Sequence, residues 1–215
     1  ELARIEALAT ATGSTVNVVL AYLCSSALRR FFKEYNALPD DSLVGVVPAS
    51  LKKRNERRPG NTIAGIRVEL GTHLGNPLER LQFIKESVER VWEDRESLPE
   101  EAATAYALMR GVPLIASQVP LLGRFVPPLF NLVTSADVGA EKRLYFNGAR
   151  LEAVYPMSQL LNHSALSIDC VSYADTVCIG FTGARDTLPH LQHLSVYFSQ
   201  AVGDLEELLE SEEAP

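Results

Sequence analysis

The chain has 215 residues, of which 47% are hydrophobic and 22% are charged. This size and composition suit one domain with a buried core, or one half of a larger two-lobed protein, and they exclude a disordered chain and a coiled coil. With 20 Lys and Arg against 27 Asp and Glu, the net charge is -7. Since an acidic chain repels a phosphate backbone, we expect no nucleic-acid partner.

The cysteines indicate a reducing compartment. Cys24, Cys170 and Cys178 form neither an even set nor a CxxC pair, so the sequence predicts no disulfide framework and no cysteine metal site. The first residues also lack the long apolar stretch of a secretory signal. We therefore expect a cytoplasmic protein.

Apolar residues recur every three or four positions in several segments. This spacing predicts helices over residues 2–12, 16–35, 77–91 and 99–110, and a last helix that begins after Thr187. The polar residues just ahead of three of these segments are typical helix caps, because their side chains accept hydrogen bonds from free backbone N–H groups. They are Ser14 or Thr15, Asn76 and Thr187.

Short apolar or alternating runs predict strands between the helices. The expected strands are residues 43–48, 63–70, 130–134, 143–146, 149–155, 166–173 and 176–181. Asn147 and Gly148 predict a tight hairpin, because both residues tolerate the positive φ of a type I′ turn.

A second hairpin is expected at residues 174–175, where a two-residue turn pairs Tyr173 with Thr176. On this register one face of the strand pair is apolar, and we expect it to meet a core. The other face carries Ser167 and Asp169, and we expect it to meet solvent or a cleft. Cys170 and Cys178 fall on opposite faces, so no disulfide between them is predicted.

The sequence lacks the common catalytic motifs, since it has no Gly-rich phosphate loop and no GxSxG elbow. His190 and His193 have a spacing that suits a metal, but no carboxylate or cysteine nearby in the sequence completes the set, and a partly exposed helix face is the favoured interpretation. His73 and His163 are interpreted as loop and turn residues.

Two segments admit both a functional and a structural interpretation. The basic residues of 52–58 either bind the phosphates of a nucleotide-like cofactor or form a solvated loop. Residues 111–133 are apolar but contain four prolines and Arg124, so a regular membrane-spanning helix is not expected. This segment either crosses the protein surface or touches a bilayer from one side.

Blocks of sequence spread over nearly the whole chain resemble, in order, the C-terminal half of the bacterial wax ester synthase/diacylglycerol acyltransferase family. The blocks are TVNVVLAYLCSSALRRF, LVGVVPASLKKR followed by GN, NPLERLQFIKES, FNLVTSAD, LYFNGARLEAVYP, the SY at 172–173, and GARDTLPHLQHL. Agreement at this many ordered blocks is far more specific than agreement at any one of them.

The resemblance implies an α/β fold of the CoA-dependent acyltransferases related to chloramphenicol acetyltransferase, in which two lobes enclose a tunnel. Residues 1–215 would form the C-terminal lobe, with a mixed sheet and packed helices. The family's catalytic HHxxxDG motif belongs to the N-terminal lobe, and this chain has no adjacent His pair. The resemblance therefore implies no catalytic residue, no metal and no tightly bound cofactor here, with acyl-CoA as co-substrate.

The resemblance also implies which residues contact the substrates. Substrate contacts are expected at Asn17, Pro48, Ser50, Gly60, Asn61, Ser167 and Asp169. Contacts with the CoA phosphates are expected at Lys52, Lys53, Arg54, Arg57 and Arg58. The chain departs from the family pattern where Val18 replaces an Asp, where residues 136–140 read ADVGA without the family's prolines, and where Ser167 to Asp169 replace Asn-Ile-Thr.

Three functions follow from these patterns. The first is the C-terminal lobe of an O-acyltransferase that acts on a fatty alcohol or diacylglycerol, peripheral to the inner membrane or to lipid droplets through residues 111–133. The second is an inactive relative that only binds lipid or CoA, which the three departures favour. The third is a non-catalytic module whose apolar segment is a partner interface.

Overall fold

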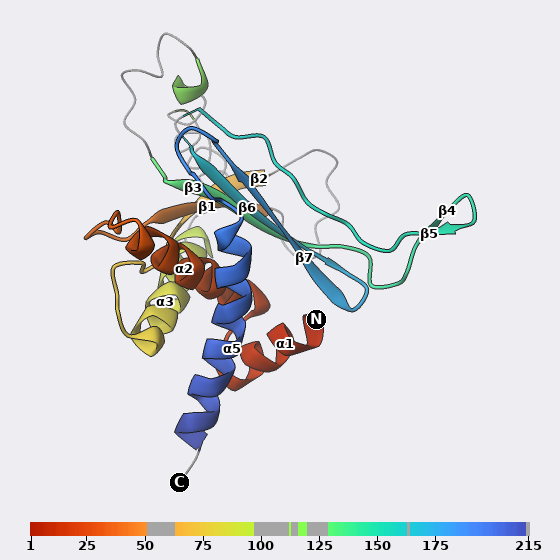
Figure 1. Cartoon of the computed structure of the whole chain (residues 1–215), viewed down its shortest axis with the longest axis horizontal. Helices are drawn as coiled ribbons and strands as arrows, with labels where there is room; N and C mark the ends of the chain where they lie inside the picture. The colour runs from red at the N-terminus through yellow and green to blue at the C-terminus, as the bar shows by residue number, and fades with distance from the viewer. Residues whose placement is uncertain (51–62, 97–111, 113–115, 120–128, 163, 214–215) are drawn as a thin grey trace.

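The computed structural model describes residues 1–50, 63–96, 112, 116–119, 129–162 and 164–213 (Figure 1). A sheet in the order β2-β1-β3-β6-β7 forms one layer, and helices cover one of its faces. Its strands are β1 (Val44–Ser50), β2 (Ile63–Glu69), β3 (Leu132–Val138), β6 (Leu166–Tyr173) and β7 (Thr176–Gly183). The pairs β1–β3 and β3–β6 are parallel and the outer pairs are antiparallel, which confirms the expected mixed sheet with packed helices.

The helices of the described part begin where their capping residues predict, with one exception. They are α1 (Leu2–Ala11), α2 (Val16–Glu34), α3 (Pro77–Glu96) and α5 (His193–Glu213). Thr15 caps α2, since its hydroxyl accepts a hydrogen bond of 3.3 Å from the backbone N–H of Val18. Asn76 caps α3 in the same way, through the N–H groups of Leu78 and Glu79.

The exception is α5, which begins at His193 rather than after Thr187. The N–H groups of Thr187 and Leu188 both donate to the carbonyl of Ala184, which makes a turn there. Pro189 then disfavours a helical conformation for the residue before it. His190 has a left-handed φ of 58°, which no α-helix contains, so the helix starts only beyond it.

The hydrophobic core lies between the helix layer and the sheet. Its fully buried side chains come from one face of α2, from the loop after β2, and from α3, β6 and α5. They include Val19, Leu23, Ala27, Leu70, Ile84, Ile168, Leu194 and Leu205. Each large apolar side chain buried in this way stabilises the fold by about 1.5–3 kcal/mol, so the core fixes the helix layer on the sheet.

Cys24 and Cys170 belong to this core, Cys178 is buried on the opposite face of the sheet, and all three cysteines are unpaired. Cys24 on α2 contacts Cys170 on β6, and the neighbouring Cys170 thiol and burial together raise the pKa of Cys24 well above its usual range. Cys170, Cys178 and Cys24 are all buried and free, as the predicted faces of the β6–β7 pair require. The Cys24 thiol therefore stays protonated.

Both predicted hairpin turns are confirmed. Tyr173 pairs with Thr176, and the register continues to Leu166 and Gly183. At the other turn, Asn147 and Gly148 have φ values of 47° and 83°. The strands beside that turn are shorter than expected, because β4 (Tyr145–Phe146) and β5 (Ala149–Arg150) pair over two residues each.

Strand β3 is longer than expected and lies further along the chain. The sequence predicts residues 130–134, whereas the strand runs from Leu132 to Val138. It pairs in parallel with β6 along its whole length, from Leu132 opposite Leu166 to Val138 opposite Ser172. This distant pairing keeps the polar end of β3 extended, which the local apolar pattern does not predict.

The polar face of β6 is expected to meet solvent or a cleft; it is buried, so the first of these alternatives is wrong. Ser167 is 0% exposed and Asp169 is 2% exposed. A segment from residue 151 to 162 crosses this face (Figure 1). Its carbonyl at Pro156 lies only 1.9 Å from where a Cβ on Gly180 would be. Since Gly180 pairs with Asp169, the segment covers the side of the sheet that the helices leave free.

Two predicted elements cannot be compared with the structure. The expected helix 99–110 and most of residues 111–133 lie outside the described residues. Over the part that is described, no single helix is long and apolar enough to cross a membrane, and α1 and α2 pass that test only as a pair bent by 99°.

The close approach at Gly180 yields a stability prediction. Gly180→Ala forces a methyl group into the Pro156 carbonyl, so we expect it to lower the free energy of unfolding by about 1–3 kcal/mol. Gly203→Ala is the matched control, because nothing lies within 4 Å of its Cβ position in α5. A better helix former there raises the free energy of unfolding by up to about 1 kcal/mol. Urea unfolding of both variants tests this, and equal values would contradict the described cover.

Candidate functional site

The buried carboxylate of Asp169 is the centre of the candidate site. The parallel pairing of β3 and β6 places Ser135 opposite Asp169, and the Ser135 hydroxyl donates a 2.9 Å hydrogen bond to Oδ1. Ser167 lies two residues earlier on the same face of β6, and its hydroxyl donates a 2.9 Å hydrogen bond to Oδ2. We call these three residues the Ser–Asp–Ser cluster.

As far as the described residues show, the cluster has acceptor positions for further hydrogen bonds. A carboxylate offers about four acceptor positions, and the two serines use two of them. Within the described residues, no histidine, lysine or arginine forms an ion pair with Asp169. The cluster is thus suited to orient a hydroxyl or an N–H donor, and the only base that its two serine hydroxyls contact within the cluster is the weakly basic carboxylate of Asp169.

Asn17 lies apart from the cluster. It is exposed in the first turn of α2, and α2 packs on the face of the sheet that bears Ile168 and Cys170. Asp169 lies on the opposite face. The neighbouring Val18 is buried in the helical core, so the apolar replacement at that position contributes to packing.

The other predicted contact residues lie at or beyond the end of β1. Pro48 pairs with Gly65 and Ser50 pairs with Ile63. Because β1 and β3 are parallel, this end of β1 points in the same direction as the end of β3 that carries Ser135. The remaining contacts, Gly60, Asn61, Lys52, Lys53, Arg54, Arg57 and Arg58, lie outside the described residues.

The chain makes a close backbone contact directly after β3. A Cβ on Gly139 would lie 2.0 Å from the carbonyl oxygen of Ser172. The Gly139 N–H accordingly lies beside the Ser172 hydroxyl, which accepts its hydrogen bond at 3.2 Å. Within the ADVGA sequence, Ala136 to Val138 are thus the end of β3, and Gly139 begins the connection after it.

A second polar group lies where α2 ends and α5 begins. His193 Nδ1 is 3.6 Å from the carboxylate of Glu34, so the fold supplies a carboxylate that the local sequence does not. His190 stacks on His193 with ring centroids 5.6 Å apart. No set of three His, Cys, Asp or Glu side chains in the described parts of the chain is arranged to hold a metal. His73 packs against Phe83 in the loop before α3, and His163 is outside the described residues.

Comparison with known proteins identifies the family. The model of the WS/DGAT C-terminal domain matches residues 59–206. The chain belongs to the wax ester synthase/diacylglycerol acyltransferase family. A putative diacylglycerol O-acyltransferase of Mycobacterium tuberculosis is 36% identical over 205 residues, which are 95% of this chain and 46% of that protein.

The solved structures agree with this WS/DGAT assignment. The wax ester synthase/diacylglycerol acyltransferase of Marinobacter aquaeolei VT8 has a TM-score of 0.82 and 31% identity, over 96% of this chain and 47% of that one. The epimerization domain from the third module of tyrocidine synthetase B has a TM-score of 0.61 at 13% identity, which shows a shared fold alone. This WS/DGAT chain spans about half the length of the relatives it matches.

Ser135 is the cluster residue that the sequence does not single out. The expected strand ends one residue before it, and its partner on β6 is 34 positions away. The only signal is its place in the block FNLVTSAD, which resembles the WS/DGAT pattern.

The Ser–Asp–Ser cluster yields a test by substitution. Asp169→Leu leaves the hydroxyls of half-buried Ser135 and buried Ser167 without their acceptor, so we expect the free energy of unfolding to fall by about 1–3 kcal/mol. Asp169→Asn keeps a side-chain oxygen in place, so its free energy of unfolding should fall clearly less. The two variants are compared by urea unfolding at one pH. Identical losses would show that the hydrogen bonds are not what Asp169 contributes.

The group at the α2–α5 junction yields a pH prediction. The hydrogen bond from the Tyr197 hydroxyl, and then the charge of His193, lower the pKa of Glu34. Tyr197→Phe removes the first cause, so the pKa of Glu34 should rise toward its usual value in an NMR titration. A lowered carboxyl pKa stabilises the fold at pH values above its usual range, and this stabilisation is lost as pH falls through the lowered pKa. The stability difference from the variant should therefore disappear in acid, and a difference that persists there would contradict the assignment.

Proposed function

We propose that this chain is the C-terminal lobe of an acyl-CoA-dependent O-acyltransferase that esterifies a long-chain alcohol or diacylglycerol. The observation that carries the proposal is the match over 96% of this chain to 47% of the Marinobacter enzyme. The names of the curated relatives support the same reaction class. The lobe would act with an N-terminal half that bears the HHxxxDG motif.

The proposed reaction divides its chemistry between the two halves. A histidine of the companion half removes the proton of the alcohol, and the oxygen attacks the carbonyl carbon of the acyl-CoA thioester. The carbon–sulfur bond then breaks, and the departing CoA sulfur receives the proton. The described part of this chain offers no such base beside a nucleophile. The role of this chain in the reaction is therefore to hold the substrates against the histidine.

The Ser–Asp–Ser cluster is the proposed polar contact of this lobe. It lies on the sheet face that the helices leave free and that residues 151–162 cross, and among the described residues only Ser135 and Ser167 donate side-chain hydrogen bonds to its buried carboxylate. We propose that Pro48, Ser50, Gly60 and Asn61 belong to the same substrate wall, because β1, β3 and β6 run in the same direction. Asn17, on the helix layer, is not brought to this wall.

The CoA and membrane contacts remain proposals on the sequence pattern. Five cations in residues 52–58 suit the phosphates of CoA. Residues 111–133 suit contact with a membrane surface or lipid droplet from the cytoplasmic side, and the described Val112 and Val119 within them are exposed.

The departures from the family pattern do not favour an inactive protein. Val18 is accommodated by the helical core, and residues 136–138 continue β3 as far as Gly139, which packs closely against the Ser172 carbonyl. Asp169 is satisfied by two hydroxyls rather than left unpaired. We therefore keep the active enzyme as the proposal, with binding without turnover as an outcome of its test.

The test uses the complete two-lobed protein with palmitoyl-CoA and either hexadecanol or dioleoylglycerol. Replacing Lys52, Lys53, Arg54, Arg57 and Arg58 by Gln should raise the KM for acyl-CoA by about tenfold or more, with a weaker salt dependence and an unchanged KM for the alcohol. Arg185→Gln is the control, since Arg185 is an exposed cation after β7. No ester product from the unmodified protein would contradict the proposed function.

A further inference from the structure

One corner of the helix layer holds two arginines and no acid. Arg29 on α2 and Arg80 on α3 both contact the loop 70–76, which joins β2 to α3. Arg80 is only 5% exposed and Arg29 is half-buried. Among the described residues, no carboxylate lies within 4 Å of either guanidinium. We call Arg29, Arg80 and this loop the arginine corner. Because a charged side chain as buried as Arg80 is usually paired with an opposite charge, the corner is short of a negative charge.

The hydrogen bonds of the two guanidinium groups go to neutral acceptors. Arg29 Nη1 donates a 2.5 Å hydrogen bond to the carbonyl of Thr72. Arg80 Nη1 donates one of 2.9 Å to the carbonyl of Leu74, and its Nη2 donates one of 3.1 Å to the Ser26 hydroxyl. These acceptors hold the two side chains in place, but they do not neutralise them.

The positive charge of Arg80 is therefore only partly compensated. Burial lowers the pKa of Arg80, contact with the Tyr22 ring raises it, and the charge of Arg29 nearby lowers it again, with a net fall. The Tyr22 ring centroid lies 5.2 Å from the guanidinium carbon. Since an arginine keeps its proton in proteins, the corner carries two positive charges that repel each other. A bound anion would offset both the burial and the repulsion.

Two buried nitrogens of the corner have no hydrogen-bond partner in the described structure. They are Arg80 Nε and His73 Nδ1. His73 lies in the loop between Thr72 and Leu74, whose carbonyls bind the two arginines. A buried polar group without a partner in a native protein calls for an explanation, and an ion bound at the site is one such explanation.

Further donors lie at the end of the loop. Within the described residues, the backbone N–H groups of Gly75 and Asn76 donate no hydrogen bond. A Cβ on Gly75 would lie 3.4 Å from Arg29 Nη2, so this guanidinium passes close to the end of the loop. Helix α3 begins directly afterwards at Pro77, and a helix N-terminus carries a partial positive charge. The accessible donors thus come from a charged side chain and from the backbone together.

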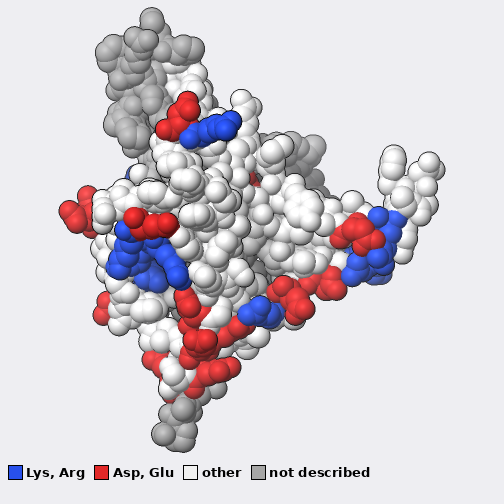
Figure 2. All heavy atoms as spheres, in the orientation of Figure 1, with Lys and Arg blue, Asp and Glu red and all other residues white. Residues whose placement is uncertain are grey.

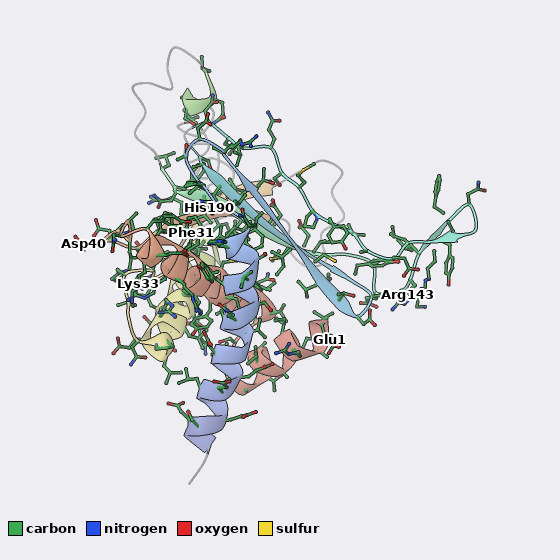
Figure 3. The ribbon with its side chains drawn as sticks, in the orientation of Figure 1. Glu1, Phe31, Lys33, Asp40, Arg143 and His190 are labelled. Atoms are coloured by element: carbon green, nitrogen blue, oxygen red, sulfur yellow. The ribbon has the colours of Figure 1, made fainter. Side chains whose placement is uncertain are left out.

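The surface beside Arg29 carries another cation. Lys33 lies four residues after Arg29 on α2, so the two side chains share one side of the helix. Figure 3 labels Lys33 at the outer side of the helix layer. Figure 2 shows basic atoms gathered at that place, with acidic atoms at their edge.

We propose that the arginine corner binds a phosphate-type anion. The Arg29 guanidinium and the N–H groups of Gly75 and Asn76 are its donors, and Arg80 supplies charge behind them. The planar fork of an arginine matches two oxygens of a phosphate group, and free backbone N–H groups ahead of a helix suit the same ligand.

This site is separate from the CoA contacts proposed above. The loop lies beside the start of β1, because the N–H of Leu43 donates a 2.9 Å hydrogen bond to the Thr72 hydroxyl. The basic residues proposed for CoA instead follow Ser50, the last residue of β1. The inference goes beyond the proposed function and does not depend on it.

Calorimetric titration of the full 215-residue chain with sodium phosphate tests the site. We expect saturable binding, and Arg29→Gln should weaken the affinity by about tenfold or more because it removes the charged fork. Arg30→Gln is the matched control. Arg30 is the next residue on α2 and is exposed, but its guanidinium lies 5.1 Å from the Tyr197 ring centroid. This variant makes the same change in net charge and should bind phosphate within about twofold of the parent.

Equal affinities for the parent and Arg29→Gln would overturn the proposal. So would an equal response to sodium chloride at the same ionic strength, which would show that phosphate only screens the surface charges.

An NMR titration of the parent protein keeps the test independent of how well any variant folds. Phosphate should shift the backbone N–H signals of Gly75 and Asn76 along a saturable curve. Gly148 is the control, because it lies in an exposed turn with no cation of the corner nearby. Absence of a shift at Gly75, or an equal shift at Gly148, would contradict the site.

Vesicles distinguish two sources of the phosphate group. If phosphatidylcholine vesicles that contain phosphatidate retain the chain, and Arg29→Gln abolishes this retention, the ligand is a lipid headgroup. If phosphate binds in solution without such retention, the ligand is a soluble phosphate compound. Neither measurement uses acyl transfer, so a two-lobed protein that makes no ester would contradict the proposed function and leave the anion site intact.

Discussion

The burial of both faces of β6 constrains the rest of the described structure. One face bears Ile168 and Cys170 and requires the helix layer. The other bears the Ser–Asp–Ser cluster and requires a separate cover. Parallel strands need a crossover connection. The chain between β3 and β6 provides this connection, and on its return it also covers the second face of β6. The β4–β5 hairpin projects from this connection before the chain returns to β6.

Local chemistry determines the parts of the fold that the sequence predicts well. The turns at Asn147 and after Tyr173 are correct because two-residue turns fix their own register. The caps Thr15 and Asn76 are correct because hydrogen bonding within one helical turn decides them. The predicted start of α5 is wrong because the favourable cap at Thr187 lies ahead of a proline. The conformational restriction that this proline imposes outweighs one capping hydrogen bond.

The candidate site is harder to predict because distant strands build it. Alternation along β6 correctly places Ser167 and Asp169 on one face, but only the parallel pairing with β3 brings Ser135 to them. The burial of that face depends on a segment with no regular periodicity of its own. In the same way, Glu34 reaches His193 only because α2 and α5 pack together. Ordered blocks of family resemblance predict the fold where periodicity alone does not.

The state of the cysteines has a chemical consequence for an enzyme proposed to handle thioesters. An acyl-CoA transfers its acyl group readily to any accessible thiolate, because the thiolate is the nucleophilic form of cysteine. Cys24 is shielded by the sheet and kept protonated by its neighbour Cys170, and Cys178 is buried as well. Such an interior protects the donor from being consumed by self-acylation, so that the activated acyl group survives until the intended hydroxyl arrives.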